Sequence, residues 1–289
     1  MGNTLILGAS GMLGNQVHKF FRQNGLDSLG TVRESEKTED PKALVDFSVE
    51  AHSDDFFSSL PQTIWVINCI GMIKSRIISA KDKPQAIRVN SLFPHQLNEA
   101  AETFDFKVIQ IATDCVYSGA TGQYSEDSMH DPTDIYGMTK SLGEVQSERF
   151  MNLRCSIIGP ELAGRSSLLE WVRSQPTGAE IDGYVNHLWN GITTLAFARI
   201  VAGIIANDGF QHGTFHVVPR DVVTKDQLVR LIADRFGRTD LSIRSATAPH
   251  LVERSLKTNF PEINARLWKD AGYAEIPSIP ELVEECPVG

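Results

Sequence analysis

The chain has 289 residues, a length that fits about two domains of roughly 150 residues each. Hydrophobic residues make up 42% and charged residues 22%, which is the balance of a folded globular protein and excludes disordered, collagen-like and coiled-coil chains. The 27 basic and 36 acidic residues give a net charge of −9, which predicts neither nucleic acid nor an acidic membrane surface as a partner.

The cysteines and the apolar segments indicate the cellular setting. Cys69, Cys115, Cys155 and Cys286 lack metal-ligand spacing, so they predict reduced thiols, a cytoplasmic location and no metal site. No apolar run reaches the ~18 residues that span a bilayer. The first residues have no basic segment ahead of their apolar run and predict a strand, not a signal peptide.

The first half of the chain alternates short apolar runs with longer amphipathic ones, a pattern typical of βαβ units on a parallel sheet. Strands are predicted at 4–7, 28–32, 64–67, 107–111 and 153–157, and helices at 12–24, 56–60, 84–103 and 135–150. Within the 84–103 helix, Ile87, Leu92, Leu97 and Ala101 form the predicted buried side.

After Gly159 the pattern loosens. Helices are predicted at 168–173, 193–206 and 225–236, a strand at 214–218, and short helices among the prolines of the tail. The predicted fold is α/β: a doubly wound parallel Rossmann sheet in residues 1–159 and a smaller mixed α/β C-terminal substrate lobe in 160–289, with 193–220 returning to the sheet.

A glycine-rich turn follows the first strand. Gly8, Gly11 and Gly14 have the spacing G-x-x-G-x-x-G between an apolar strand and a helix, the context that dinucleotide binding requires. The glycines allow a tight turn, close approach of a pyrophosphate and close helix packing, and the phosphates then meet helix N-terminal amides. The alternative is a glycine turn without a ligand.

Arg33 follows the second strand, with Lys37 nearby, where an acidic residue would accept the ribose hydroxyls of NAD. A guanidinium suits the 2′-phosphate of NADP, so the sequence favours NADP over NAD. Glu34 and Glu36 weaken this signal, and the alternative is that Arg33 is a solvated surface charge.

Tyr136 and Lys140 form a Y-x-x-x-K pair near a helix start, and the i, i+4 spacing puts both on one face. An ammonium group beside a phenol lowers the pKa of the phenol, which then exchanges a proton with a carbonyl or alcohol oxygen. The alternative is an ordinary surface helix. At the carboxyl end of a central strand, where such sheets bind ligands, Thr113 would hold the reacting oxygen, and Asp114 follows it.

Together these stretches resemble an extended short-chain dehydrogenase/reductase, and within it the dTDP-4-dehydrorhamnose reductase-like sugar-nucleotide family. The matching segments are LGASGMLG, WVINCIG, ATDCVYSGATGQYSED, YGMTKSLGE and LRCSIIGPE, in the family's order over roughly residues 3 to 161. Asn186-His187 and the segment 191–194 match the family's substrate side loosely.

The resemblance implies a catalytic set of Thr113, Tyr136 and Lys140, joined by Cys115. It implies cofactor contacts from Gly8, Ser10, Gly11, Met12, Leu13, Gly14, Arg33, Asp46, Phe47, Ile70, Gly71, Asn90 and Lys140. It implies substrate contacts from Asp114, Val116, Tyr117, His187, Trp189 and Asn190.

Cys115 departs from the family's pattern. The sugar 4,6-dehydratases carry an acid at this place and rhamnose-type reductases usually a Tyr, whereas GDP-fucose synthase has a Cys that moves protons beside the ketone. With His187 as partner acid, Cys115 leaves an epimerase-reductase open. The alternative is a small residue that shapes the sugar pocket.

The resemblance implies NADPH-dependent reduction of the keto group of a nucleotide-activated keto-6-deoxysugar. Two alternatives stay open. One is a nucleotide-sugar 4-epimerase with bound NAD; the other is a non-catalytic NADP-binding regulatory subunit like the beta subunit of methionine adenosyltransferase. A nucleotide sugar is the expected partner, and a homodimer is left open.

Overall fold

Seven parallel strands form the central sheet in the part of the chain that the structure describes, in the order β11-β6-β5-β4-β1-β2-β3. The structure is a computed structural model that describes residues 3–33, 44–49, 54–59, 63–162 and 167–288. The strands are β1 (Asn3–Leu7), β2 (Ser28–Val32), β3 (Leu44–Asp46), β4 (Thr63–Asn68), β5 (Lys107–Ala112), β6 (Phe150–Arg154) and β11 (Gly213–His216). The strand order reverses between β1 and β4, where open α/β sheets bind ligands. The predicted doubly wound Rossmann sheet is confirmed.

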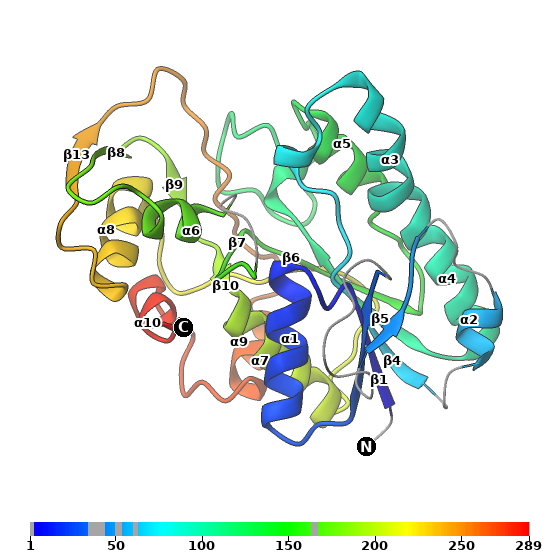
Figure 1. The fold of residues 1–289 in the computed structure, drawn as a ribbon. Helices are drawn as coiled ribbons and strands as arrows, with labels where there is room; N and C mark the ends of the chain where they lie inside the picture. Colours follow the sequence, from blue (N-terminus) through cyan, green and yellow to red (C-terminus); the bar gives the residue numbers. More distant parts are fainter. Residues whose placement is uncertain (1–2, 34–43, 50–53, 60–62, 163–166, 289) are drawn as a thin grey trace.

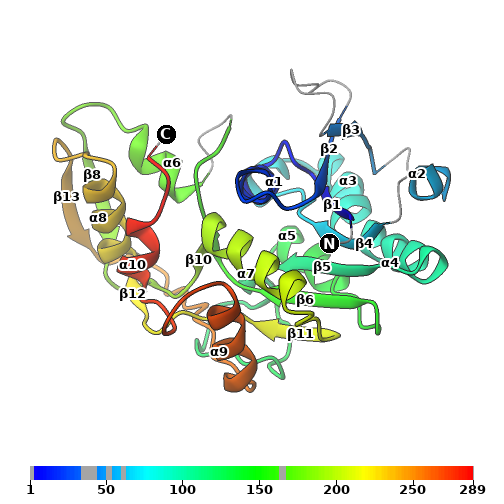
Figure 2. The same cartoon turned by 90° about the horizontal axis from the view of Figure 1, so that it is seen from below.

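Helices cover both faces of the sheet, as Figures 1 and 2 show. One face carries α1 (Met12–Gln23), α7 (Thr194–Ala206) and α9 (Pro261–Asp270). The other carries α2 (Asp54–Ser59), α3 (Lys83–Ile87), α4 (Phe93–Phe104) and α5 (Ile135–Leu142). In the described ranges no helix has both the length and the apolar character that a bilayer crossing needs.

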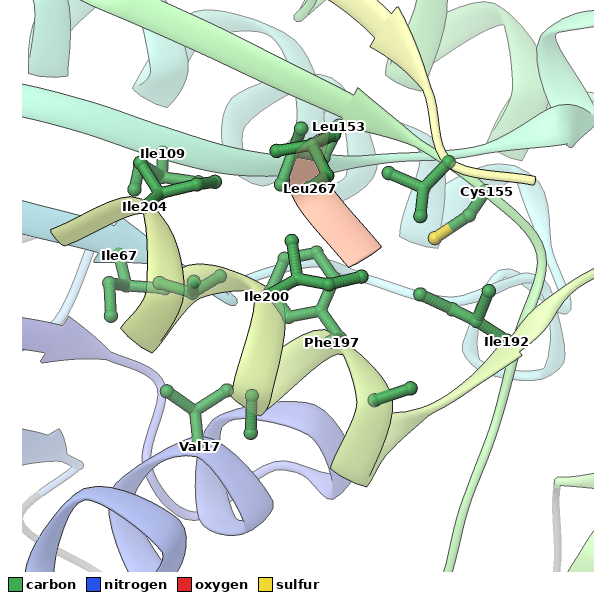
Figure 3. Close-up of a cluster of buried hydrophobic side chains, with 14 of the residues drawn as sticks. Val17, Ile67, Ile109, Leu153, Cys155, Ile192, Phe197, Ile200, Ile204 and Leu267 are labelled. Carbon is green, nitrogen blue, oxygen red and sulfur yellow. The ribbon is translucent and has the colours of Figure 1, made fainter. Parts of the chain in front are cut away.

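Successive strand residues alternate between the two faces, which gives two cores. Ile67 and Ile109 pack with Val17 of α1 and with Phe197 and Ile200 of α7, the cluster shown in Figure 3. Their sequence neighbours join the opposite core against α4. A sheet that is apolar on both faces must be covered on both, and this explains the continuous apolar runs of its central strands.

The helix predicted over 84–103 contains a π-helical turn, Arg88–Leu92, between α3 and α4. Pro94 has no amide hydrogen for the carbonyl of Asn90, and the wider turn sits at this break. The prediction that Ile87 and Leu92 are buried is wrong, because the extra residue rotates the face: each is 50% exposed.

The helix that carries Tyr136 and Lys140 is shorter than predicted. α5 ends at Leu142, not at 150, and Gly143 is its C-cap; a Cβ at this glycine would overlap the carbonyl oxygen of Asn90, so the end of the helix packs directly on that backbone. The chain then turns and enters β6 at Phe150, three residues before the predicted strand, and the short β7 (Ile157–Ile158) follows.

The C-terminal lobe has its own core. Its helices are α6 (Leu168–Arg173), α8 (Lys225–Arg235) and α10 (Ile279–Glu284). Its strand pairs are β8 (Glu180–Tyr184) with β13 (Ser242–Ala246), and β9 (Leu188–Trp189) with β12 (Val223–Thr224). Strand β10 (Ile192–Thr193) pairs with β7, and α7 and β11 then lie with the sheet. The lobe strands are short, and the sequence pattern did not predict them.

The lobe is tied to the loop that follows β5. Tyr124 of this loop bridges Leu256, whose backbone is also held at both ends by the Asn190 amide, at 2.6 and 2.9 Å. This contact carries the segment before Leu256 across the carboxyl end of β5, where the predicted catalytic residues lie.

Candidate active site

The glycine loop joins β1 to α1 in a geometry that only glycine permits at two positions. Gly8 has φ of 82° and donates its N–H to the Thr31 hydroxyl at 2.9 Å. A Cβ at Gly14 would overlap the carbonyl oxygen of Gly8. Gly11 is the N-cap of α1, so the first amides of this helix face the loop. The arrangement can receive a phosphate.

A cavity of about 330 Å³ opens beside this loop. It is lined by Gly8, Ser10, Gly11, Thr31, Val32, Arg33, Phe47, Ser48, Val49, Cys69, Ile70, Gly71, Met72, Arg76, Gln85 and Val89. Seven of the predicted cofactor residues therefore line it, and they follow the ends of the four strands β1, β2, β3 and β4: Gly8, Ser10, Gly11, Arg33, Phe47, Ile70 and Gly71. Arg76 is a second guanidinium at this cavity, and no sequence motif marked it.

Other predicted cofactor residues lie elsewhere. Leu13 packs into the core below the sheet, and Met12 does not line the cavity. Asp46 ends β3, and its side chain lies outside what the structure describes, as does Lys37. Asn90 is 1% exposed.

The polar atoms of Asn90 are used inside the protein. Its side-chain oxygen accepts the Met72 N–H at 2.8 Å, and its amide donates to the Met72 carbonyl at 2.9 Å and to the Thr139 hydroxyl at 3.1 Å. Asn90 therefore ties the loop after β4 to the helix that carries Tyr136. It positions the site and does not present a polar atom to the cofactor.

Thr113, Tyr136 and Lys140 are brought together at the carboxyl end of β5. Asp134 caps α5 by accepting the Gly137 N–H at 2.9 Å, which fixes the start of the helix two residues before Tyr136. A Cβ at Gly137 would overlap the carbonyl oxygen of Cys115, so the helix packs directly on the loop. Thr113 lies close enough to the Tyr136 phenol to act on its pKa.

Burial dominates the electrostatics of this group. It raises the pKa of Tyr136, and the Cys115 and Asp114 groups raise it further. It lowers the pKa of Lys140 to about 8. The amine of Lys140 donates to the Ile111 carbonyl at 2.9 Å. The expectation that Lys140 brings the Tyr136 pKa down is therefore not met in this structure, because desolvation of the phenol is the larger effect.

Asp114 and Cys115 form a short 3₁₀ turn capped by Thr113, whose hydroxyl accepts the Cys115 N–H at 3.2 Å. Burial and the adjacent Asp114 carboxylate raise the pKa of the Cys115 thiol to about 12. His187, the predicted partner acid, instead lies with Nε2 2.8 Å from the His250 carbonyl oxygen. The cations that act on Asp114 are Arg254 and Lys225.

Four of the predicted substrate contacts are internal. Val116 and Tyr117 have no exposed surface, so their side chains cannot reach a substrate. Trp189 is 5% exposed and donates its indole N–H to Ser156 at 2.9 Å. Asn190 is committed to Leu256. These four residues support the site from the protein interior, because each of them packs into a core or closes a loop.

Two functional candidates were missed by the sequence analysis. Lys225 is the first residue of α8, and Arg254 lies in the segment that crosses the loop after β5. Neither stands in a motif; only long-range pairing brings them to the site. Among the residues that the structure describes, no three His, Cys, Asp or Glu side chains are grouped as metal ligands.

The RmlD substrate binding domain family model matches residues 2–286. Methionine adenosyltransferase 2 subunit beta of Pongo abelii is 26% identical over 257 residues, which cover 84% of this chain and 75% of that protein. The dTDP-4-dehydrorhamnose reductase of Streptomyces griseus is 24% identical over 280 residues, 93% of this chain and 87% of that one.

Solved structures share the fold. The dTDP-4-dehydrorhamnose reductase of Bacillus anthracis str. Ames, in complex with NADP, superposes with a TM-score of 0.74 at 17% identity and 98% coverage of both chains. MoeE5 in complex with UDP-glucose and NAD gives 0.73 at 19% identity, over 98% of this chain and 96% of that one. At these identities the likeness shows the fold alone.

Proposed function

The chain belongs to the RmlD substrate binding domain family, and from this premise we propose that it is an NADPH-dependent reductase of a nucleotide-linked keto-6-deoxysugar. The observation that carries the proposal is the convergence of Thr113, Tyr136 and Lys140 at one strand end. The glycine-loop cavity opens at the same edge of the sheet. The names of the reductase relatives support the substrate class.

The cavity suits the adenosine diphosphate part of the cofactor. The amides after Gly11 would hold the pyrophosphate, and Ile70 and Gly71 would line its path. Arg33 and Arg76 both line the cavity, and guanidinium groups bind phosphate in a bidentate manner, so the pair favours NADP over NAD. NADPH, when bound, supplies the hydride that reduces the carbonyl carbon.

Tyr136 acts as the proton donor. Its raised pKa keeps the hydroxyl protonated at neutral pH, which is the form that can protonate a carbonyl oxygen during reduction. The Thr113 hydroxyl orients the same oxygen. Lys140, with a pKa of about 8, is mostly charged at pH 7 and stabilises the phenolate that remains.

We assign Cys115 the role of a neutral thiol at the sugar pocket. A base for epimerisation would have to be a thiolate, and a pKa of about 12 leaves almost none at neutral pH. The intact enzyme should therefore introduce no deuterium from D2O at C3 or C5 of the sugar. Deuterium wash-in at either carbon would contradict this role and identify the chain as an epimerase-reductase.

The reductase is tested by NADPH consumption against 4-keto sugar nucleotides carrying dTDP, UDP, GDP or CDP, generated in situ by dehydratases. Turnover of at least one of them, lost in Tyr136→Phe, is the expected result. Tightly bound NAD after purification, with interconversion of epimers, would identify the 4-epimerase instead.

A non-catalytic regulatory subunit is the second candidate, because methionine adenosyltransferase 2 subunit beta aligns with 84% of the chain. A regulatory subunit would bind NADPH and oxidise none across the same panel. The complete set of Thr113, Tyr136 and Lys140 favours the enzyme, because a pure binder has no use for a proton donor.

A further inference from the structure

Three charged side chains surround the reaction centre without pairing. Asp114 follows β5, Lys225 begins α8, and Arg254 comes from the segment that crosses the same loop. The Asp114 carboxylate interacts electrostatically with both cations. Within the described part of the chain, none of the three makes a salt bridge.

Lys225 is held in place by its surroundings. Its backbone N–H donates to the His187 carbonyl at 2.8 Å, and its Nζ lies 5.5 Å from the centre of the Trp189 ring. Trp189 is itself fixed by its bond to Ser156. The amine makes no hydrogen bond to any described residue, and burial lowers its pKa to about 8. The ammonium group of Lys225 therefore offers three N–H donors at the end of a positioned side chain.

Arg254 comes from a different segment of the chain. Its Nε donates to the Tyr117 carbonyl at 2.8 Å, which fixes the guanidinium over the loop. Its Nη1 lies 3.9 Å from the Cys115 sulfur, two residues from Thr113. The guanidinium therefore lies beside the turn that follows Thr113, where the proposed function places the sugar.

We propose that Lys225 and Arg254 bind an oxyanion of the substrate, while Asp114 accepts a hydroxyl of its sugar. Arg254 also interacts electrostatically with Asp131 and Asp134, whereas the carboxylate that acts on Lys225 is that of Asp114. Half-buried charges without a salt bridge are costly, so a ligand that forms an ion pair with them gains affinity. The proposal rests on the proposed function, in which the substrate is a nucleotide sugar. The oxyanion is either the diphosphate link or a carboxylate on the sugar ring.

Binding of unreactive probes tests this by calorimetry with NADP-saturated protein. The nucleoside diphosphates dTDP, UDP, GDP and CDP are titrated first, then the glucose and glucuronic acid derivatives of the base that binds. Lys225→Met should weaken binding about 10- to 100-fold, and Lys225→Arg should retain it. Lys269→Met, an exposed lysine on α9, makes the same charge change as a control and should bind like the wild type.

The probes separate the two sources of the oxyanion. If the diphosphate is held, Lys225→Met weakens the free diphosphate and both sugar derivatives by the same factor. If a carboxylate is held, the glucuronic acid derivative binds wild type more tightly than the glucose derivative, and only this excess is lost. Unchanged affinities in Lys225→Met overturn the proposal, as does a wild type that binds none of the probes.

The binding measurement separates this inference from the proposed function. A chain that loses affinity in Lys225→Met but oxidises no NADPH keeps the anion site and loses the reductase. A chain that turns over a keto sugar while Lys225→Met binds and turns over like the wild type keeps the reductase and loses the anion site. Thermal unfolding of Lys225→Met, compared with Lys269→Met, shows that the variant is folded.

Discussion

The loop after β5 contributes to two charged clusters of opposite kind. The sealed cluster centres on Arg154, which is 1% exposed and pairs with Glu144 at 3.0 and 2.5 Å. Its other donors reach the Tyr117 hydroxyl and the Nε2 atoms of His216 and His130, at 2.6, 2.7 and 2.9 Å. The open cluster consists of Asp114, Lys225 and Arg254, and none of these has a salt bridge in the described ranges.

The difference indicates that the sealed cluster stabilises the fold, whereas the open cluster is available to bind a ligand. In the sealed cluster both histidines accept from Arg154 at Nε2, so each is neutral with its proton on Nδ1. Burial lowers the pKa of His130 and takes that of His216 to about 4, so these charges do not change near neutral pH. Every strong donor has a protein partner. In the open cluster the amine of Lys225 lies over the Trp189 ring and makes no hydrogen bond to any residue that the structure describes.

The largest effect is expected at the reaction centre that faces the open cluster. Tyr136→Phe removes the proton donor and should lower kcat about 10²- to 10⁴-fold, while NADPH affinity and thermal unfolding stay close to wild type. NADPH oxidation, cofactor titration and a melting curve measure the three quantities. Undiminished turnover would remove Tyr136 from the mechanism.

A substitution in the sealed cluster should instead lower the free energy of unfolding. Arg154→Met leaves the Glu144 carboxylate, 4% exposed, without its partner, and should cost about 3–5 kcal/mol of unfolding free energy. Arg149→Met breaks an exposed pair with Asp105 and should cost at most about 1 kcal/mol. Chemical denaturation measures both. Equal losses in the two variants would mean that the sealed cluster does not stabilise the fold.

The sequence predicted the parts of the site that local chemistry defines. The turn at Gly8 and the helix face of Tyr136 and Lys140 follow from backbone geometry and spacing over a few residues. Lys225 and Arg254 could not be predicted, because each reaches the site through pairings between segments far apart in the chain, such as Tyr124 with Leu256. In the 84–103 helix Leu97 and Ala101 are buried as predicted, whereas Ile87 and Leu92 are exposed for a local reason, the π-helical turn.

A smaller effect is expected in the cofactor cavity, away from both clusters. Arg33→Ala should weaken NADPH about tenfold or more and leave NADH nearly unchanged, because only NADPH carries the 2′-phosphate. Lys19→Ala, an exposed charge on α1, is the matched control. The ratio of kcat/KM for NADPH and NADH measures the preference. An unchanged ratio would leave Arg76 as the remaining guanidinium at the cavity.

The smallest effect is a pH dependence that belongs to the open cluster. With its pKa lowered to about 8, Lys225 is charged below pH 8 and neutral above it, while Asp114 and Cys115 are the groups that face it. The charged amine binds the oxyanion, so the Kd of a nucleoside diphosphate should rise by at most about tenfold between pH 7 and pH 9. Lys225→Arg stays charged and should flatten this rise.

Lys140 also titrates near pH 8, but it acts on proton transfer, so its effect appears in kcat and persists in Lys225→Arg. A Kd that rises equally in wild type and Lys225→Arg would assign the titration to another group and leave the open cluster without its switchable charge.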